Sequence, residues 1–271
     1  MPLASSGSAS EAFDGFDRLS FTSEGRTYPL FRIGSGPGVI VMTEMPGISP
    51  KVAAFGRRIA DEGFTAVLPS LFGTPGREPT IGYGLQSMVP ACVAKEFAAL
   101  ATDKTAPVTL WLRALARQVH GECGGPGVGA VGMCFTGGFA LGMMLDDTTV
   151  APVLSQPSLP IAVSKSRRGA VGLSATDLAA VRARAAAGCD VLGLRFTGDK
   201  FVPKERFETL RRELGDRFIA VEIDSSEGNA HGIPKNAHSV LTEHLVDEPG
   251  HPTRDALNQV LTFFKDRLSP G

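Results

Sequence analysis

Four short apolar runs constrain the fold of this chain more than any other feature of its sequence. They cover residues 39–42, 64–68, 128–132 and 191–196, and within each run the apolar residues are nearly continuous. Continuous runs of this length are typical of strands buried on both faces, as in a parallel sheet covered by helices. Because parallel neighbours require a long crossover connection, helices are expected between the runs. The pattern predicts an α/β chain with a mostly parallel central sheet.

Weaker patterns complete the expected architecture. Residues 19–33 alternate in polarity around Gly25 and predict a pair of edge strands, and residues 150–155 and 218–223 predict two more strands. Helices are expected in segments that include 50–62, 88–100, 108–118, 137–145, 204–214 and 254–268. About eight strands alternating with helices predict one three-layer domain, with helices on both faces of the sheet.

Composition excludes several classes of protein. Of the 271 residues, 43% are hydrophobic and 20% are charged, so the chain can bury a large core. We expect a flexible tail over residues 1–15 and a single domain over residues 16–271. The formal net charge of −1 lacks the basic excess of nucleic-acid binders, so no nucleic-acid partner is expected. No apolar run has the length of a membrane span, and the first residues lack the features of a secretion signal. We therefore expect a cytoplasmic protein with no membrane partner.

The four cysteines have no spacing that implies a bound metal. Cys92, Cys123, Cys134 and Cys189 form no CxxC pair, and no cysteine–histidine cluster has zinc-site spacing. A disulfide framework is not expected in a chain of this size, so each cysteine is predicted to be a reduced thiol, by default a buried one. No metal and no organic cofactor is expected.

Cys134 differs from the other cysteines because of its neighbours. It lies in residues 132–138 (GMCFTGG), where a predicted strand ends and a helix of small residues begins. This is the G-x-S-x-G nucleophile elbow with sulfur in place of oxygen, except that Thr136 takes the place of the second glycine, which is displaced to Gly137. A helix N-terminus also favours a thiolate. The alternative is a buried cysteine in a glycine-rich turn.

Asp199 directly follows the predicted strand over residues 191–196, in the sequence FTGDKFVP. A carboxylate at this place suits the acid of a catalytic triad, which orients a histidine and stabilises its cation. The alternative is an aspartate that forms an Asx-turn or caps the next helix. Nucleophile, acid and then histidine is the chain order of the α/β-hydrolase fold, so we predict that fold.

The triad base is expected among the four histidines that follow the last predicted strand. His251 precedes the terminal helix and is predicted to cap it, and His244 is expected to be structural. His231 and His238 both remain as candidates, and the residues by themselves leave this choice open.

Glu44 ends the first predicted central strand, and a carboxylate there is expected to face the elbow across the sheet. The backbone N–H groups of Met45 and Phe135 would then be placed to hold an oxyanion. The alternative for Glu44 is an exposed loop residue.

Three stretches, residues 39–73, 128–138 and 194–203, resemble the dienelactone hydrolase family. The family combines a strand-end glutamate, an elbow cysteine, an aspartate before a V-P pair, and a histidine. By motif these correspond to Glu44, Cys134, Asp199 and either His238 or His231.

The resemblance also implies a mechanism. The resting thiol is turned toward the glutamate, which accepts its proton when substrate binding swings the cysteine into line. The thiolate attacks an ester carbonyl, and the histidine–aspartate pair activates water to release the acyl group.

The two candidate histidines match the family differently. Its base usually occurs as Gly-His-Ser or Gly-His-Gly, which is similar to AHS over residues 237–239 and to AHG over residues 230–232. Counting from Asp199 favours His231, whereas counting back from the end of the last helix favours His238. We take His238 as the base, with residues 227–235 as an insertion. The prototype enzyme of the family carries an arginine four residues after its base, and this sequence has Thr242 there, or Lys235 if His231 is the base.

We therefore predict a cysteine-dependent hydrolase of small esters or lactones that forms an acyl-thioester intermediate. One alternative is a thioesterase or acyltransferase on the same scaffold. Another is a non-catalytic, redox-responsive protein in which Cys134 is an oxidation-sensitive thiol. The only partner implied is a small-molecule ester or lactone, and the sequence allows a homodimer without specifying one.

Overall fold

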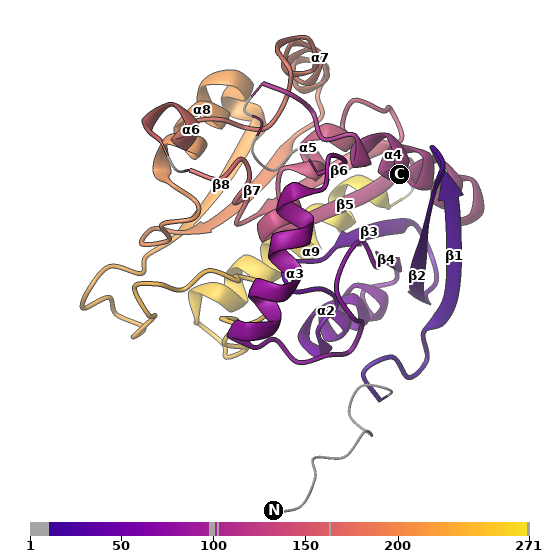
Figure 1. Ribbon diagram of the computed structural model, residues 1–271, viewed down its shortest axis with the longest axis horizontal. Coiled ribbons are helices and arrows are strands. Elements are labelled where there is room, and N and C mark those ends of the chain that lie inside the picture. The colour runs from indigo at the N-terminus through magenta and orange to yellow at the C-terminus, as the bar shows by residue number, and fades with distance from the viewer. Residues whose placement is uncertain (1–10, 98–100, 102, 163, 270–271) are drawn as a thin grey trace, which may run out of the picture.

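The computed structural model describes residues 11–97, 101, 103–162 and 164–269, and an eight-stranded sheet forms its centre (Figure 1). The strand order is β1-β2-β4-β3-β5-β6-β7-β8, and only the contacts of β2 with β1 and with β4 are antiparallel. This is the mostly parallel three-layer architecture predicted from the apolar runs.

The strands follow the sequence patterns closely. Their bounds are β1 Asp17–Ser23, β2 Arg26–Gly34, β3 Gly38–Met42, β4 Thr65–Pro69, β5 Val128–Met133, β6 Thr149–Ser155, β7 Val191–Phe196 and β8 Phe218–Ile223. The four predicted central strands β3, β4, β5 and β7 are buried at every residue, as continuous apolar runs require. The edge pair β1 and β2 is joined at Glu24 and Gly25, which both have positive φ.

Helices cover both faces of the sheet (Figure 1). Helices α2 (Pro50–Asp61) and α9 (Pro252–Leu268) pack on one face. The opposite face carries α4 (Val108–Cys123), α5 (Phe139–Met143), α7 (Ala175–Ala186) and α8 (Lys204–Leu214). A short helix, α6, spans Lys165–Arg168. None of the helices that the structure describes combines the length and apolar character needed to cross a membrane.

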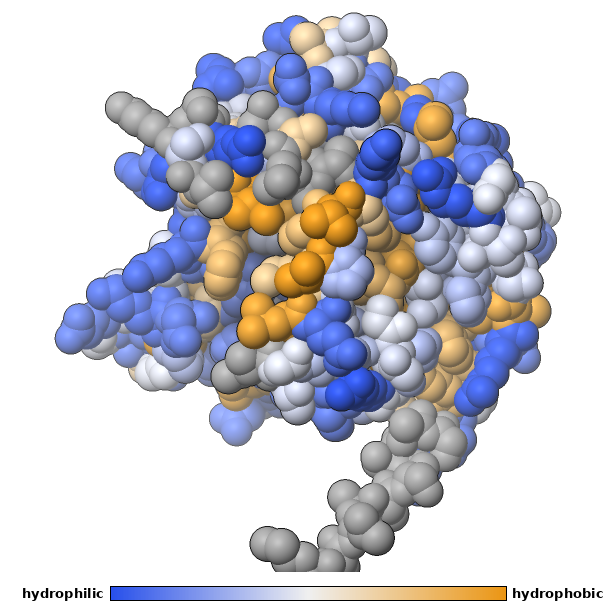
Figure 2. Space-filling view, viewed as in Figure 1, coloured by the Kyte–Doolittle hydropathy of each residue, from blue (hydrophilic) through white to orange (hydrophobic). Residues whose placement is uncertain are grey.

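One helix lies elsewhere than predicted. A helix was expected over residues 88–100, but α3 spans Ile81–Val93, and residues 98–100 lie outside the described chain. The helix begins earlier because the Thr80 hydroxyl caps it by accepting the Tyr83 N–H at 3.2 Å, and the Tyr83 side chain is buried. On the face seen in Figure 2, α3 leaves apolar side chains exposed, namely Leu85, Met88, Val89 and Val93.

The packed part of the chain also begins before the predicted boundary at residue 16. Residues 1–10 of the predicted tail lie outside the described chain. Within residues 11–15, Phe13 is buried, and its ring centroid lies 4.1 Å from that of Phe31 on β2. Packing against the sheet therefore includes Phe13, which lies within the segment predicted to be the tail.

The strand order determines where polar side chains can gather. After β3 the chain moves outward to β4 and then returns to the other side of β3 to form β5. Strand order reverses there, and in open α/β sheets ligands bind at the carboxyl ends of the strands beside such a switch point. Glu44 follows β3 and Cys134 follows β5, so both lie at this edge.

The turn after β5 approaches its neighbours too closely for side chains at two positions. A Cβ at Gly132 would overlap the carbonyl oxygen of Thr136, and one at Gly137 would overlap the backbone of Pro157. Backbone atoms cannot move aside as a flexible side chain can, so glycine is required at both positions.

We expect Gly132→Ala to lower the free energy of unfolding by about 1–3 kcal/mol, because overpacking of a rigid site has this typical cost. The matched control is Gly121→Ala on α4, where an added Cβ would meet nothing within 4 Å. That change should be neutral or stabilising by up to about 1 kcal/mol, since alanine is the better helix former. Urea unfolding of both variants tests this, and equal stability of the two would contradict it.

Candidate active site

The elbow turn is built around a strained residue. Cys134 has φ +53°, in the left-handed region that non-glycine residues rarely adopt. It begins a single 3-10 turn, Cys134–Thr136, directly after β5. Its carbonyl oxygen accepts the N–H groups of Gly137 and Ser158, both at 3.0 Å. Strain of this kind persists only where the surroundings over-determine the backbone, and it recurs at active sites.

Thr136 explains why the second glycine of the elbow can be displaced. Its hydroxyl accepts the Met133 N–H at 3.0 Å and lies 3.0 Å and 3.1 Å from the carbonyl oxygens of Met42 and Thr43. The side chain therefore joins the elbow to the end of β3. The close approach that glycine permits occurs one residue later, at Gly137.

The Cys134 side chain is half-buried and has a polar neighbour. Its Sγ lies 3.5 Å from the Ser158 Oγ. Ser158 belongs to the segment after β6, which the fully buried guanidinium of Arg206 holds in place by donating to carbonyl oxygens. These acceptors are the carbonyls of Pro157, Pro160, Arg167 and Ala170. Burial lowers the pKa of Arg206 to about 10, and the group still keeps its charge at neutral pH.

Asp199 and His238 are brought together at the end of β7. His238 Nδ1 lies 2.6 Å from Asp199 Oδ2, and the Asp199 side chain is only 2% exposed. The other carboxylate oxygen of Asp199 accepts the Phe201 N–H at 2.9 Å. Asp199 therefore forms the Asx-turn of the alternative interpretation as well as the bond to histidine. The exposed ring of Phe201 packs edge-on against His238, with centroids 5.5 Å apart.

His238 has a strongly perturbed pKa. Burial lowers it, but charge and hydrogen bonding with Cys134 and Asp199 outweigh burial and raise the pKa well above its ordinary value. Cys134 and His238 are therefore electrostatically coupled. A histidine between a thiol and a buried carboxylate is the arrangement used in nucleophilic catalysis by cysteine.

The competing candidate, His231, lies elsewhere. It is exposed, and its ring packs against that of His251 with centroids 5.3 Å apart. His251 is the N-cap of α9, as predicted, and its Nδ1 accepts the Thr253 N–H. Of the two histidines, the structure pairs only His238 with Asp199. The catalytic role of His238 stays a prediction.

Glu44 is buried rather than an exposed loop residue, at 4% exposure. Its Oε2 accepts the Ser239 hydroxyl at 2.5 Å and the Gln156 amide at 3.2 Å, and its Oε1 accepts the Thr242 hydroxyl. Burial raises the pKa of Glu44, while the hydroxyl donors oppose that rise. Among the described residues, none of its hydrogen bonds goes to Cys134, so the contact implied by the family mechanism is not present in this conformation.

The two predicted oxyanion donors border the elbow. The Phe135 ring is buried in an aromatic cluster with Phe72, Phe97 and Phe139, at centroid distances of 5.6, 5.5 and 6.3 Å. Met45 directly follows Glu44. The backbone N–H groups of Met45 and Phe135 take part in none of the turn, loop and capping hydrogen bonds of the described residues. Both groups are therefore predicted to be free for a substrate oxygen.

Sequence reasoning missed several polar residues of the site. Ser158, Gln156 and Ser239 contact Cys134 or Glu44, and the bond from Thr242 to Glu44 was likewise not predicted. A usable signal existed for two of them, because residues 155–158 (SQPS) follow a predicted strand and so reach the same sheet edge. No local sequence signal marks Ser239 and Thr242. Their partner, Glu44, lies about 195 residues earlier in the chain.

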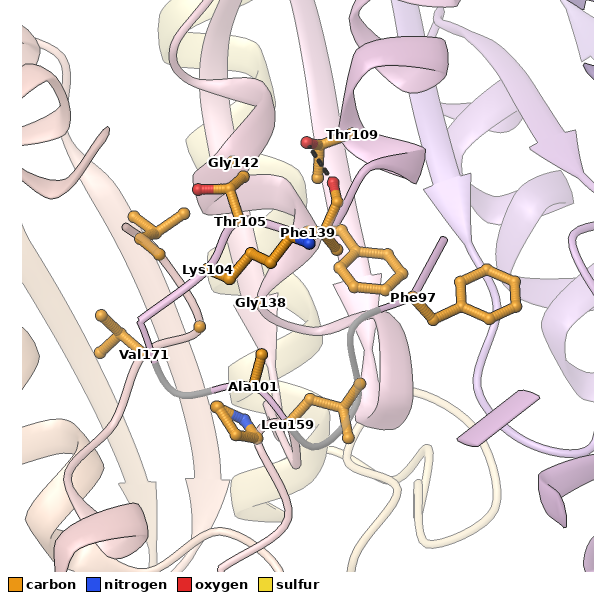
Figure 3. Close-up of a pocket in the computed structure, with 14 residues that line it drawn as sticks. Phe97, Ala101, Lys104, Thr105, Thr109, Gly138, Phe139, Gly142, Leu159 and Val171 are labelled. Carbon is orange, nitrogen blue, oxygen red and sulfur yellow. Dashed lines mark hydrogen bonds between the residues drawn. The ribbon is translucent and has the colours of Figure 1, made fainter. Parts of the chain in front are cut away.

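A small cavity behind the elbow is separate from this site (Figure 3). Its volume is about 20 Å³, room for about one water molecule. Its lining includes Gly138, Phe139, Gly142, Leu159 and Val171. None of the candidate catalytic residues lines it, so it is not a substrate pocket. Within the described part of the chain, no three metal-ligating side chains gather into a cluster.

Comparison with known families identifies the family of this chain. The family model described as "Dienelactone hydrolase family" matches residues 29–268, so the chain belongs to the dienelactone hydrolase family. Membership places it among hydrolases that act on ester bonds, lactones being cyclic esters. No curated protein sequence matches the chain.

Solved structures share the fold. A proposed dienelactone hydrolase from Klebsiella pneumoniae is 19% identical, with a TM-score of 0.63 over 92% of this chain and 97% of the other. A dienelactone hydrolase-like promiscuous phosphotriesterase from metagenomic libraries is 18% identical, with a TM-score of 0.58 over 94% and 98%. A cold-adapted esterase from an Arctic intertidal metagenomic library is 14% identical, with a TM-score of 0.53 over 93% of each chain. Identities this low establish the fold alone.

We expect Cys134→Ala to lower the pKa of His238, because it removes charge and hydrogen bonding that raise the pKa and leaves the opposing effect of burial. In the wild type His238 should stay protonated as the pH rises past 6.5, and in the variant it should lose its proton at lower pH. Histidine ring NMR titration measures both. Cys92→Ala on α3 is the matched control and should leave the titration unchanged; an unchanged His238 in Cys134→Ala would refute the coupling.

Proposed function

We propose that the protein is a cysteine-dependent hydrolase of small esters or lactones, with Cys134 as nucleophile, His238 as base and Asp199 as the acid that orients it. The observation that carries the proposal is the 2.6 Å bond between His238 and Asp199, beside a cysteine at φ +53° on the elbow. The raised pKa of His238 supports it, because a base that holds a proton firmly stabilises the thiolate beside it.

The acylation step begins from the Cys134 thiolate beside protonated His238, which holds the proton of the thiol. Since Nδ1 of His238 is bonded to Asp199, Nε2 is the nitrogen left for the thiol. The thiolate attacks the ester carbonyl, a carbon–sulfur bond forms, and the carbonyl oxygen gains the negative charge. The N–H groups of Met45 and Phe135 are the proposed donors to that oxygen. Collapse of the intermediate breaks the carbon–oxygen bond, and the leaving alkoxide takes the proton from His238.

In the deacylation step His238 takes a proton from water. The resulting hydroxide adds to the thioester carbonyl, the carbon–sulfur bond breaks, and the carboxylic acid leaves Cys134 as a thiolate. His238, again protonated, is stabilised throughout by Asp199. The proton acceptor implied by the family, Glu44, is hydrogen-bonded to Ser239 and Thr242 instead, so the acceptor proposed for the thiol proton is His238, whose pKa Cys134 raises.

The substrates proposed are small and uncharged near the base. Thr242 occupies the place of the family's arginine, and its hydroxyl is already bonded to Glu44. The exposed ring of Phe201 beside His238 adds an apolar surface at the site. An uncharged ester or lactone suits these groups better than a substrate whose carboxylate needs a cationic partner.

The test is hydrolysis of p-nitrophenyl acetate and of a small unsaturated lactone. Cys134→Ala should lose the nucleophile and fall to background, and His238→Ala should lose about 100-fold or more, a typical contribution of general base catalysis. Acid-quenched wild-type enzyme should carry one acetyl group on Cys134, detectable by mass spectrometry of the peptide.

His231→Ala is the matched control, because His231 is an exposed histidine of the same loop region that does not contact Asp199. It should keep wild-type activity. Loss of activity in His231→Ala with retention in His238→Ala would move the base to His231 and overturn the assignment. A wild type inert on every ester, lactone and thioester tested would leave the redox interpretation of Cys134 in its place.

A further inference from the structure

His244 holds the backbone of the segment that carries the proposed base. Its Nδ1 accepts two backbone N–H groups, from His238 at 3.3 Å and from Ser239 at 3.2 Å. In return the His244 N–H donates to the Ser239 carbonyl at 3.0 Å. These bonds close a compact turn in a stretch that forms neither helix nor strand. The imidazole of His244 therefore accepts the two backbone N–H groups that would be bonded to carbonyl oxygens in a helix or strand.

The two residues whose backbone His244 holds, His238 and Ser239, each contact a buried carboxylate of the site. His238 pairs with Asp199 at 2.6 Å, and the adjacent Ser239 donates to the buried carboxylate of Glu44 at 2.5 Å. A shift of this backbone would displace both contacts together. Catalytic geometry is sensitive to such shifts, since a displacement of about 1 Å can cost about 100-fold in rate.

We propose that His244 is a positioning residue for His238: the neutral imidazole, unprotonated at Nδ1, holds the backbone of residues 238–239, and protonation of His244 releases it. A protonated imidazole carries hydrogen on both nitrogens and accepts no hydrogen bond. The proposal rests on the proposed function only in treating His238 as the base. Hydrolysis would then weaken in acid through a group that never contacts the substrate.

The charges around His244 favour its neutral form. Burial lowers its pKa most, and the cations of His238 and Lys51 act in the same direction, while Glu243 and Asp199 oppose them. Lys51 on α2 and Glu243 are themselves paired at 2.8 Å. The net effect places the pKa of His244 below 6.5, so the imidazole is neutral at neutral pH and gains a proton only in more acidic solution.

The test compares two amide substitutions of nearly equal chemistry. In His244→Asn the side-chain oxygen lies near the former Nδ1 and can accept both N–H groups, whereas the longer side chain of His244→Gln places its amide nearer the former Nε2. We expect kcat of the asparagine variant to stay within a few-fold of wild type at neutral pH. In the glutamine variant kcat should fall by up to about 100-fold, with KM little changed.

The pH profile separates positioning from general damage. Because asparagine does not titrate, the ratio of the activity of His244→Asn to that of the wild type should rise as the pH falls below 6.5. A ratio that stays constant with pH, or a glutamine variant as active as wild type, would overturn the proposal.

A second readout needs no activity. Ring ¹⁵N shifts of the wild type at neutral pH should show His244 unprotonated at Nδ1, and the amide protons of His238 and Ser239 should lose exchange protection in His244→Gln but keep it in His244→Asn. A proton on Nδ1 would overturn the proposal directly. Failure of the wild type to hydrolyse any ester would instead refute the proposed function, and these NMR results would still decide the role of His244.

Discussion

The positive φ of Cys134 is the constraint on which the rest of the site depends. A non-glycine residue at φ +53° costs about 1–3 kcal/mol, and the surrounding structure must hold it there. Because Gly132 and Gly137 have no side chain, the backbone of Thr136 can approach the first and that of Pro157 the second. The Thr136 hydroxyl connects the turn to the end of β3. This backbone conformation leaves the Cys134 side chain half-buried at the edge of the sheet.

The other two residues of the proposed triad, Asp199 and His238, lie in loops rather than in helices or strands. Asp199 lies three residues after the end of β7, and its position is secured by the Phe201 N–H and by the close fit of Gly198 against Ser225 and Lys235. His238 has no such support from a strand. Its segment depends on side-chain partners, and a single altered partner there has more effect than it would on a helix, where many backbone bonds share the restraint.

Two buried carboxylates serve this arrangement in different environments. Asp199 faces a histidine that can carry positive charge, whereas Glu44 faces the neutral donors Ser239, Thr242 and Gln156. With no cation among its hydrogen-bond partners, Glu44 has a pKa that burial raises. Gln156 is itself held at φ +37° and fully buried, which indicates that the cradle of Glu44 is a second place where backbone strain is accepted.

The sequence predicted the strands, the elbow and the acidic residue after β7 because each depends on local pattern. Continuous apolar runs reveal strands buried on both faces, and small residues around Cys134 reveal a close strand-to-helix turn. The position of α3 could not be predicted in the same way, because the burial of Tyr83 and the cap at Thr80 decide where it begins. The partners of Glu44 were equally inaccessible, since Ser239 lies 195 residues away along the chain.

The same distinction explains why the hydrogen bonds of Glu44 in this structure differ from the contact implied by family resemblance. Motif fixes which residue stands at the end of β3, but the partner of its carboxylate depends on a loop more than 190 residues later. In this chain that loop supplies two hydroxyls, one of them at the place of the family's arginine. Taking the thiol proton would cost this carboxylate hydrogen bonds made to its ionised form, and those bonds oppose the rise in its pKa that burial causes. His238 has the opposite balance, since Asp199 and Cys134 both stabilise its protonated form. In the proposed mechanism the thiol proton therefore passes to His238, and the hydrogen bonds of Glu44 connect the elbow edge of the sheet with the loop that carries the proposed base.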